Sequence, residues 1–365
     1  MPTRREILQW AAALATLPAL GRAQTPAERA KKPLDILFLG GTGFLGPHQV
    51  EYALARGHRV TLFNRGKTAP NLYGERAEVL LGDRDSKTAP GLAALEGTRR
   101  WDVVIDNSGY IPRHVHDSVE LLKARCGRYI YVSTVAVYDP AKGTKFDETS
   151  ALRPAPEPAT EKVTGASYGP LKAECDRIVH AALGAKATIV RPTYIVGPGD
   201  ETDRFTYWVE RMARGGEVLG PPNPAAELQW IDARDLCPWI VDLAERDLSG
   251  IFNAAGPSTA VTWEKVLTEL AKGSAQPASV KWSTNAALDK TGIQLPLVRQ
   301  PFFGGADSLH FDSSAALVAG LRFRSLEDTA AATRAWWSQE PQEHRAKPKG
   351  WPSAAQEQET LKLLG

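Results

Sequence analysis

The stretch Leu34-Asp35-Ile36-Leu37-Phe38-Leu39-Gly40-Gly41-Thr42-Gly43-Phe44-Leu45-Gly46 decides the fold of this chain of 365 residues. Its mostly apolar first half predicts a buried strand, and glycines at 40, 43 and 46 follow directly. A helix-like segment from Pro47 to Arg56 and a second strand, Arg59–Phe63, come next. Glycines leave no side chain between the backbone and a pyrophosphate, and amides at the helix start face its charge. The stretch therefore predicts a dinucleotide-binding loop; glycines that only form a tight turn are the alternative.

The residues after the second strand indicate which dinucleotide is bound. A carboxylate there would accept hydrogen bonds from ribose hydroxyls and repel a 2′-phosphate. This chain instead has Arg65, which can bind a 2′-phosphate through paired hydrogen bonds, and Lys67 as a second cation. NADP is therefore favoured over NAD. The alternative is that Arg65 and Lys67 are simply solvated loop charges. The cofactor-binding residues assigned to this part of the chain are Gly40, Thr42, Gly43, Phe44, Leu45, Gly46, Asn64, Arg65 and Lys67.

Three further predicted strands, Val79–Leu81, Trp101–Ile105 and Arg128–Val132, end in polar residues. In an open parallel sheet, ligands bind at the carboxyl ends of the strands, so these residues should lie near one another. A carboxylate after the first of them can accept a hydrogen bond from an adenine amino group. We assign Asp83, Arg84, Ser108 and Gly109 to the cofactor, and the hydroxyls of Ser133 and Thr134 follow the last strand.

A tyrosine and a lysine mark the candidate reacting centre. Tyr168 opens a predicted helix that runs to Leu183, and Lys172 follows four residues later. Four residues are about one helical turn, so both side chains leave the same face. A nearby ammonium lowers the pKa of a phenol from about 10 toward neutrality, which makes tyrosine usable as an acid and a base.

Taken in order, these motifs resemble the extended short-chain dehydrogenase/reductase family, which includes nucleotide-sugar epimerases and dehydratases. The similarity runs from about Leu34 to about Trp337 and includes Val190–Asp200, Trp230–Leu236 and Gly250–Gly256. The resemblance implies that Tyr168 transfers the proton and that Thr134 binds the reacting oxygen. It also implies that Lys172 adjusts the pKa of the Tyr168 phenol and binds the nicotinamide ribose. Pro192 is assigned to the cofactor on the same basis.

The resemblance also implies the architecture, a Rossmann-like doubly wound parallel α/β sheet with a small C-terminal substrate-binding cap. Residues 34–196 form the NAD(P)-binding domain, 197–340 a mixed part with the cap and returning sheet elements, and 341–365 a surface tail. Helices are predicted over Trp263–Ala271 and Ser325–Trp337, with an irregular stretch over Ser283–Phe303 between them. The helices His114–Cys126 and Tyr168–Leu183 are predicted to pair with their copies in a homodimer, because family members associate through these segments.

Two departures from the family pattern narrow the substrate. Dehydratases carry Thr-Asp-Glu where this chain has Thr134-Val135-Ala136, so the carboxylates that drive water elimination are missing. Nucleotide-sugar epimerases place an arginine that binds the diphosphate where this chain has Glu227-Leu228-Gln229, so a UDP-sugar is disfavoured. The substrate is expected to be a small sugar-like molecule.

The N-terminus predicts export. Arg4 and Arg5 precede a mildly apolar stretch, Trp10–Leu20, and a small-residue cleavage site at Gly21-Arg22-Ala23, which together resemble a twin-arginine signal over residues 1–23. The mature protein would be periplasmic or extracellular.

Excluding residues 1–23 reduces 44 basic and 42 acidic residues to 41 of each. A neutral chain lacks the positive charge that supports nucleic-acid binding, and no membrane span is predicted.

Composition excludes other classes. The chain is 43% apolar and 24% charged, which is typical of a folded protein, and its three cysteines include no CxxC pair that would indicate a structural zinc site. No metal site is therefore expected.

Nicotinamide cofactors are not readily recycled outside the cytoplasm, so export favours a redox-neutral epimerase or isomerase. An NADP-dependent ketone or sugar reductase is the alternative, followed by a catalytically silent dinucleotide- or RNA-binding module.

Overall fold

The computed structural model describes residues 28–157, 159–298 and 309–365. The predicted export signal, residues 1–23, lies outside these ranges. The described chain divides into two compact units. Unit 1 consists of the described residues up to Thr193 with Ala233–Ala255 and Phe311–Arg322, and unit 2 of the described residues in Tyr194–Asp232, Gly256–His310 and Phe323–Gly365.

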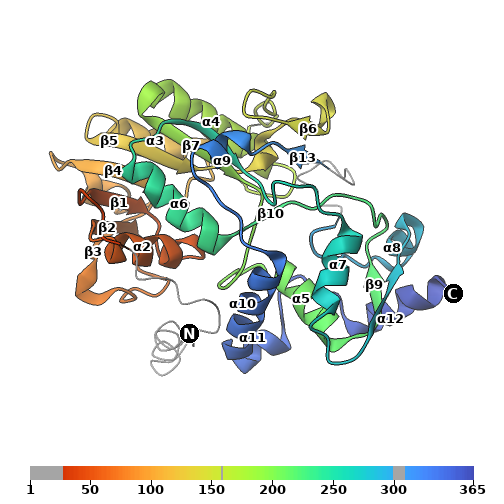
Figure 1. Ribbon diagram of the computed structural model, residues 1–365. Helices are drawn as coiled ribbons and strands as arrows, with labels where there is room; N and C mark the ends of the chain where they lie inside the picture. The colour runs from red at the N-terminus through yellow and green to blue at the C-terminus, as the bar shows by residue number, and fades with distance from the viewer. Residues whose placement is uncertain (1–27, 158, 299–308) are drawn as a thin grey trace. The chain divides into compact units, whose positions relative to one another are not determined.

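Unit 1 alternates strands and helices, as its sequence pattern predicts (Figure 1). Its elements are β1 (Asp35–Leu39), α2 (Leu45–Ala55), β2 (Arg59–Asn64), β3 (Glu78–Leu81), β4 (Trp101–Asp106), α3 (Pro112–Leu122), β5 (Cys126–Val132), β6 (Lys145–Phe146), α4 (Tyr168–Leu183), β7 (Ala187–Pro192), α6 (Ala233–Glu245), β11 (Gly250–Ala254) and α9 (Ser314–Val318).

Seven strands of unit 1 form one parallel sheet in the order β11-β7-β5-β4-β1-β2-β3. The last residue of β1, Leu39, lies level with Phe63 of β2 and Asp106 of β4. The carboxyl ends of the central strands therefore meet at one edge, and the loops that follow them adjoin one another. This sheet confirms the predicted Rossmann-like α/β fold.

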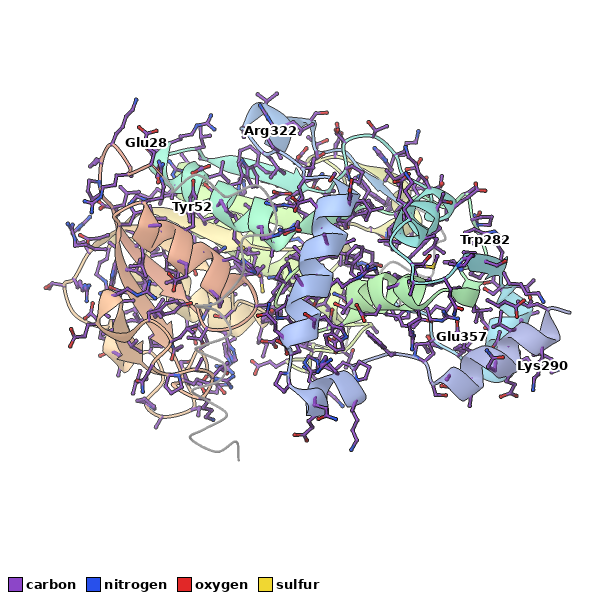
Figure 2. All side chains as sticks on the ribbon, turned by 60° about the horizontal axis from the view of Figure 1, so that its bottom comes forward. Glu28, Tyr52, Trp282, Lys290, Arg322 and Glu357 are labelled. Carbon is purple, nitrogen blue, oxygen red and sulfur yellow. The ribbon has the colours of Figure 1, made fainter. Side chains whose placement is uncertain are left out.

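Helices cover both faces of the sheet. On one face, α3 and α4 pack against each other and bury Val115, Val119 and Leu122 completely in the core, while Ile178 lies partly buried against it. On the other face, α2 packs on α6, and the Tyr52 hydroxyl, labelled in Figure 2, donates to Asp242. These three apolar residues of α3, a helix predicted to form a homodimer interface, are thus buried within the core of one chain, and the homodimer stays a prediction.

Unit 2 is smaller and mixed. Its elements are β8 (Tyr194–Val196), α5 (Arg204–Arg214), β9 (Gly216–Gly220), β10 (Trp230–Asp232), α7 (Trp263–Ala271), β12 (Ala278–Trp282), α8 (Asn285–Thr291), α10 (Leu326–Gln339), α11 (Gln342–Ala346) and α12 (Ala354–Leu363), and strand β13 (His310–Phe311) falls at its boundary. Strands pair in parallel twos, β10 with β8 and β12 with β9. A separate hydrophobic core includes Trp208, Trp230 and Trp263.

Several predicted boundaries differ from the structure. Helix α3 ends at Leu122 because Cys126 already begins β5, and the stretch expected to be irregular after Ser283 contains α8. Residues 341–365, expected as a surface tail, include α12, where Leu361 is buried. Glu357 of the same helix, labelled in Figure 2, is buried and accepts hydrogen bonds from the Arg211 guanidinium. An amphipathic helix with so few apolar residues gives a weak periodic signal, which explains the difference.

Among the described residues, no helix is both long enough and apolar enough to span a bilayer.

Candidate active site

The glycine loop between β1 and α2 has a geometry that side chains could not adopt. Gly40 and Gly41 have φ of +109° and +108°, a region that L side chains rarely occupy. A Cβ on Gly46 would lie 2.2 Å from the backbone carbon of Gly41, so this glycine lets the helix start against the loop. At Gly43, which is exposed, a Cβ would meet nothing within 4 Å. The loop is therefore packed at its ends and open at its middle, where the backbone can be approached.

Side chains missed by the sequence analysis hold this loop. The buried Tyr73 hydroxyl donates to the Gly41 carbonyl at 2.6 Å, and the Asn107 amide donates to the Gln49 side chain at 2.6 Å. The Ser108 hydroxyl donates to the Leu39 carbonyl at 3.0 Å. The Asn107 and Ser108 contacts join the end of β4 to α2 and to the end of β1, which places Ser108 beside the loop.

The end of β2 presents its cations to solvent. Arg65 and Lys67 are exposed, and the Asn64 side chain accepts from the Gly66 amide at 2.8 Å, which shapes the turn. Asp83, after β3, is partly buried and accepts from the Asp85 amide at 3.0 Å. Exposed guanidinium and ammonium groups at this position are accessible to a phosphate.

Arg84 lies in a different environment from the one expected. Its buried guanidinium donates to both carboxylate oxygens of Asp106, at 2.6 and 3.0 Å, and to the Ser108 hydroxyl at 3.1 Å. Burial would raise the pKa of Asp106, but Arg84 and the Tyr129 hydroxyl overcome this and keep it below its ordinary value. Arg84 is therefore bound to Asp106 at the end of β4, and this carboxylate neutralises its charge.

Lys172 is the most enclosed residue of the predicted catalytic set. Its ammonium donates to the Gly109 carbonyl at 2.7 Å, the Tyr131 hydroxyl at 2.6 Å and the Val132 carbonyl at 2.9 Å. Burial lowers its pKa, against the opposing effect of nearby groups that include Asp106. The structure thus brings Lys172 and Gly109 together, and adds Tyr131, which sequence analysis did not identify.

The first turn of α4 packs against the loop that carries Thr134. A Cβ on Gly169 would lie 2.4 Å from the Ala136 carbonyl oxygen, so glycine is required directly after Tyr168. Thr134 is buried and caps the short helix η3 (Val135–Val137) by accepting from the Ala136 amide at 3.2 Å. Tyr168 is partly exposed and its ring lies 6.4 Å from that of Tyr110. Sequence positions 134 and 168 are therefore brought to adjoining segments.

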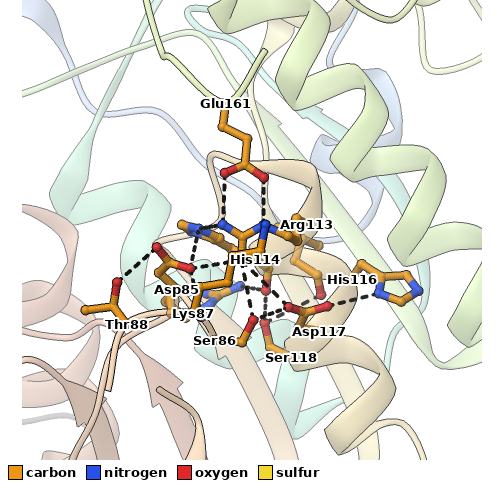
Figure 3. Close-up of polar contacts among 12 residues, drawn as sticks. Asp85, Ser86, Lys87, Thr88, Arg113, His114, His116, Asp117, Ser118 and Glu161 are labelled. Atoms are coloured by element: carbon orange, nitrogen blue, oxygen red, sulfur yellow. Dashed lines mark hydrogen bonds and ion pairs between the residues drawn. The ribbon is translucent and has the colours of Figure 1, made fainter. Parts of the chain in front are cut away.

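An arginine at the start of α3 fastens the segment that leads to Tyr168. Arg113 donates to both carboxylate oxygens of Glu161, at 2.6 and 2.9 Å, and to Asp85 at 2.9 Å (Figure 3). Hydrogen bonds to the Lys87 amide and to Arg113 lower the pKa of Asp85 to about 2. The hydrogen bonds of Arg113 therefore link the loop after β3 to the loop before α4.

Of the six buried side-chain polar atoms without a hydrogen-bond partner among the described residues of unit 1, four lie near the carboxyl ends of the strands: Gln49 Nε2, Arg84 Nε, Asn107 Oδ1 and Ser133 Oγ. The other two, Trp101 Nε1 and Asp176 Oδ1, lie elsewhere. Buried polar groups without partners are uncommon in folded proteins, and binding sites are one place where they occur. Together with the open middle of the glycine loop, they fit a polar cofactor such as a nicotinamide dinucleotide. Pro192 ends β7 and is buried, with no contact that assigns it a role.

Within the described ranges, no cluster of three or more histidine, cysteine, aspartate or glutamate side chains has a geometry suited to a metal ion.

Comparison with known proteins agrees with this geometry. The sequence model of one family, the NAD dependent epimerase/dehydratase family, matches residues 36–255. These residues include the glycine loop, Thr134, Tyr168 and Lys172. That match covers more than half of the chain.

Solved structures share the fold. A UDP-glucuronic acid 4-epimerase from Bacillus cereus in complex with NAD superposes with a TM-score of 0.60 at 16% identity, covering 82% of this chain and 96% of that one. The Bordetella bronchiseptica enzyme WbmH in complex with NAD+ gives a TM-score of 0.61 at 17% identity, covering 85% and 100%. At these identities the similarity establishes the architecture.

A curated relative from Arabidopsis thaliana is named as a binding protein. It is the chloroplast stem-loop binding protein of 41 kDa b, 28% identical over 264 residues. The match covers 68% of this chain and 65% of the relative, so the chain spans about two thirds of that protein's length.

Proposed function

The chain belongs to the NAD dependent epimerase/dehydratase family, whose members are NAD(P)-dependent enzymes, and from this premise we propose that it catalyses a redox-neutral epimerisation at a hydroxyl-bearing carbon of a sugar-like substrate. The observation that carries the proposal is the placement of Lys172. Its ammonium is buried at the carboxyl end of β5, one helical turn after Tyr168 and hydrogen-bonded to the carbonyl of Gly109.

In this proposal Tyr168 is the acid and base. Its Oη takes the proton of the substrate hydroxyl and returns it when that hydroxyl is re-formed. The Lys172 ammonium favours the phenolate by its charge, and the Thr134 hydroxyl donates a hydrogen bond to the reacting oxygen. When bound, a nicotinamide supplies reversible hydride acceptance at the same carbon.

The chain's own residues suggest how the cofactor would be held. The open middle of the loop at Gly43 admits a pyrophosphate to the start of α2, where backbone amides face it. We propose that the exposed Arg65 and Lys67 bind a 2′-phosphate, which would favour NADP over NAD. In this proposal Asp83 accepts a hydrogen bond from the adenine amino group, and Ser108 and Gly109, which follow β4, contribute to the cofactor site.

We further propose export by the twin-arginine route, on the strength of residues 1–23. An exported enzyme that consumed one hydride per turnover would stop after one cycle without a recycling partner. A reaction that returns the hydride to its substrate continues with one bound cofactor, which supports epimerisation over reduction.

A turnover experiment tests this function. Purified protein, without added cofactor, is incubated with a panel of sugars and sugar nucleotides, and products are identified by NMR. We expect inversion of one stereocentre over many turnovers by the wild type and its loss in Tyr168→Phe. Activity that requires one added NADPH for every product molecule would instead identify a reductase.

The curated relative supports a second candidate, binding of nucleic-acid stem-loops. The near balance of 44 basic and 42 acidic residues opposes it, because phosphate-backbone binding depends on positive charge. Fluorescence anisotropy with a labelled RNA stem-loop and a single strand of equal length decides. Tighter binding of the stem-loop that weakens steeply with salt would support this candidate; no difference between the two RNAs would exclude it.

A further inference from the structure

Two tyrosine rings lie near the Lys172 ammonium. The Nζ atom lies 4.1 Å from the centroid of the Tyr131 ring and 5.3 Å from that of Tyr110. Both distances are within the range in which a cation is attracted to the face of an aromatic ring. Each of the three N–H groups of the ammonium also has an acceptor, provided by Gly109, Tyr131 and Val132. This environment suits a charged lysine in spite of its burial.

The two rings differ in exposure. Tyr131 is fully buried in the core, whereas Tyr110 is 46% exposed and directly follows Gly109, whose carbonyl accepts from Lys172. Lys172 itself is only 2% exposed. Tyr110 therefore lies at the solvent side of the ammonium. Its ring also approaches Tyr168, with centroids 6.4 Å apart and planes tilted by 37°.

We infer that Tyr110 is a positioning residue that shields the Lys172 ammonium from water and so preserves its electrostatic effect on the Tyr168 phenol. The inference rests on the proposed function, because it takes Tyr168 as the acid and base. Water around an ion pair weakens the interaction between the charges several-fold relative to a protein environment. Removing the ring would therefore hydrate the ammonium and reduce its ability to favour the Tyr168 phenolate.

A competing effect has the opposite sign but is smaller. The Tyr110 ring also lies beside that of Tyr168, and hydrating a phenol favours its ionised form. Tyr168 is already partly exposed, however, so its hydration changes little when the ring is lost, whereas that of Lys172 changes from nearly none. Screening of the ammonium therefore dominates, and loss of the Tyr110 ring should raise the pKa of Tyr168.

The test is a tyrosinate absorbance titration of the full purified chain. Each protein is titrated with and without Tyr168→Phe, and the difference isolates the Tyr168 phenol. We expect a wild-type pKa clearly below the ordinary value of about 10, and a rise of about one unit in Tyr110→Leu. Tyr110→Phe, which keeps the ring, should retain the wild-type value. Leu81→Ala, which truncates an exposed apolar side chain on β3, is the matched control and should shift nothing.

The outcomes separate the inference from the proposed function. A lowered wild-type value that Tyr110→Leu leaves unchanged would overturn the inference and leave the role of Tyr168 intact. A wild-type Tyr168 that titrates near 10 would overturn both. Circular dichroism verifies folding, and should Tyr110→Leu fail to fold, Tyr110→Met removes the ring with an unbranched side chain and is judged by the same criterion.

Discussion

Tyr168 begins α4 beside the loop of Thr134, and its substitution by phenylalanine removes one oxygen atom. The ring and the packing of Gly169 against Ala136 are retained, so we expect the Tyr168→Phe variant to fold and bind cofactor like the wild type. Its turnover should fall by roughly two to four orders of magnitude, the usual contribution of general acid–base catalysis. Steady-state kinetics on an accepted substrate measures this, and wild-type turnover would remove Tyr168 from the mechanism.

Arg65 carries the predicted cofactor preference. It is exposed at the end of β2, so exchanging it for aspartate should leave the fold unchanged. A carboxylate there repels a 2′-phosphate and accepts from ribose hydroxyls, and we expect Arg65→Asp to bind NAD more tightly than NADP. Titration of both cofactors into cofactor-free protein checks this. Equal NADP affinity before and after the exchange would show that Arg65 does not contact the phosphate.

At the scale of elements, the glycine loop offers a matched pair of variants. A Cβ at Gly43 meets no atom within 4 Å, so Gly43→Ala should fold normally while its methyl group obstructs the approach of the pyrophosphate. A Cβ at Gly46 would collide with the Gly41 backbone at 2.2 Å, so Gly46→Ala should lose stability as well as affinity. Thermal unfolding and cofactor titration separate the two effects. Unimpaired cofactor binding by Gly43→Ala would place the pyrophosphate elsewhere.

Local pattern was sufficient to predict the elements that form the site. The apolar run before Gly40 predicted β1, and the apolar spacing after Tyr168 predicted α4 with its observed bounds. Both depend on neighbours in sequence, where periodicity is informative. The parallel direction of the strands then followed from the alternation of strands and helices.

The partners of the site residues could not be predicted in this way. Arg84 was assigned to the cofactor, and the structure shows that it pairs with Asp106, because the loop after β3 reaches the end of β4 only once the sheet is assembled. Tyr131 lies in an apolar strand and resembled an ordinary core residue until Lys172 was placed against it. A charged residue at the end of an apolar strand, such as Asp106, is a signal that a buried cation lies nearby.

At the scale of the whole molecule, stability should depend on pH through His344. This histidine bonds to Asp203 and to Glu340, each at 2.8 Å, within unit 2. Burial lowers its pKa, but these carboxylates outweigh burial and raise it above 6.5. A raised histidine pKa stabilises the fold fully below the unfolded value, and this contribution is lost as the pH rises through the folded value.

The difference in unfolding temperature between wild type and His344→Gln should therefore be largest below pH 6.5 and shrink in alkaline buffer. His116→Gln, the same substitution at an exposed histidine that is labelled in Figure 3, provides the control for the loss of an imidazole. A difference for His344→Gln that stays constant across this range would mean that its charge contributes nothing.

We propose that one chain holds its own nicotinamide cofactor and completes a hydride cycle with it. Mass spectrometry of the small molecules released when purified protein is gently denatured tests this most directly. We expect NADP(H), or NAD(H), at about one molecule per chain in the wild type and much less in Gly43→Ala, since the added methyl group obstructs the loop. Wild-type protein that folds normally and releases no nicotinamide dinucleotide would contradict the claim and indicate a freely exchanging cofactor or a binding function instead.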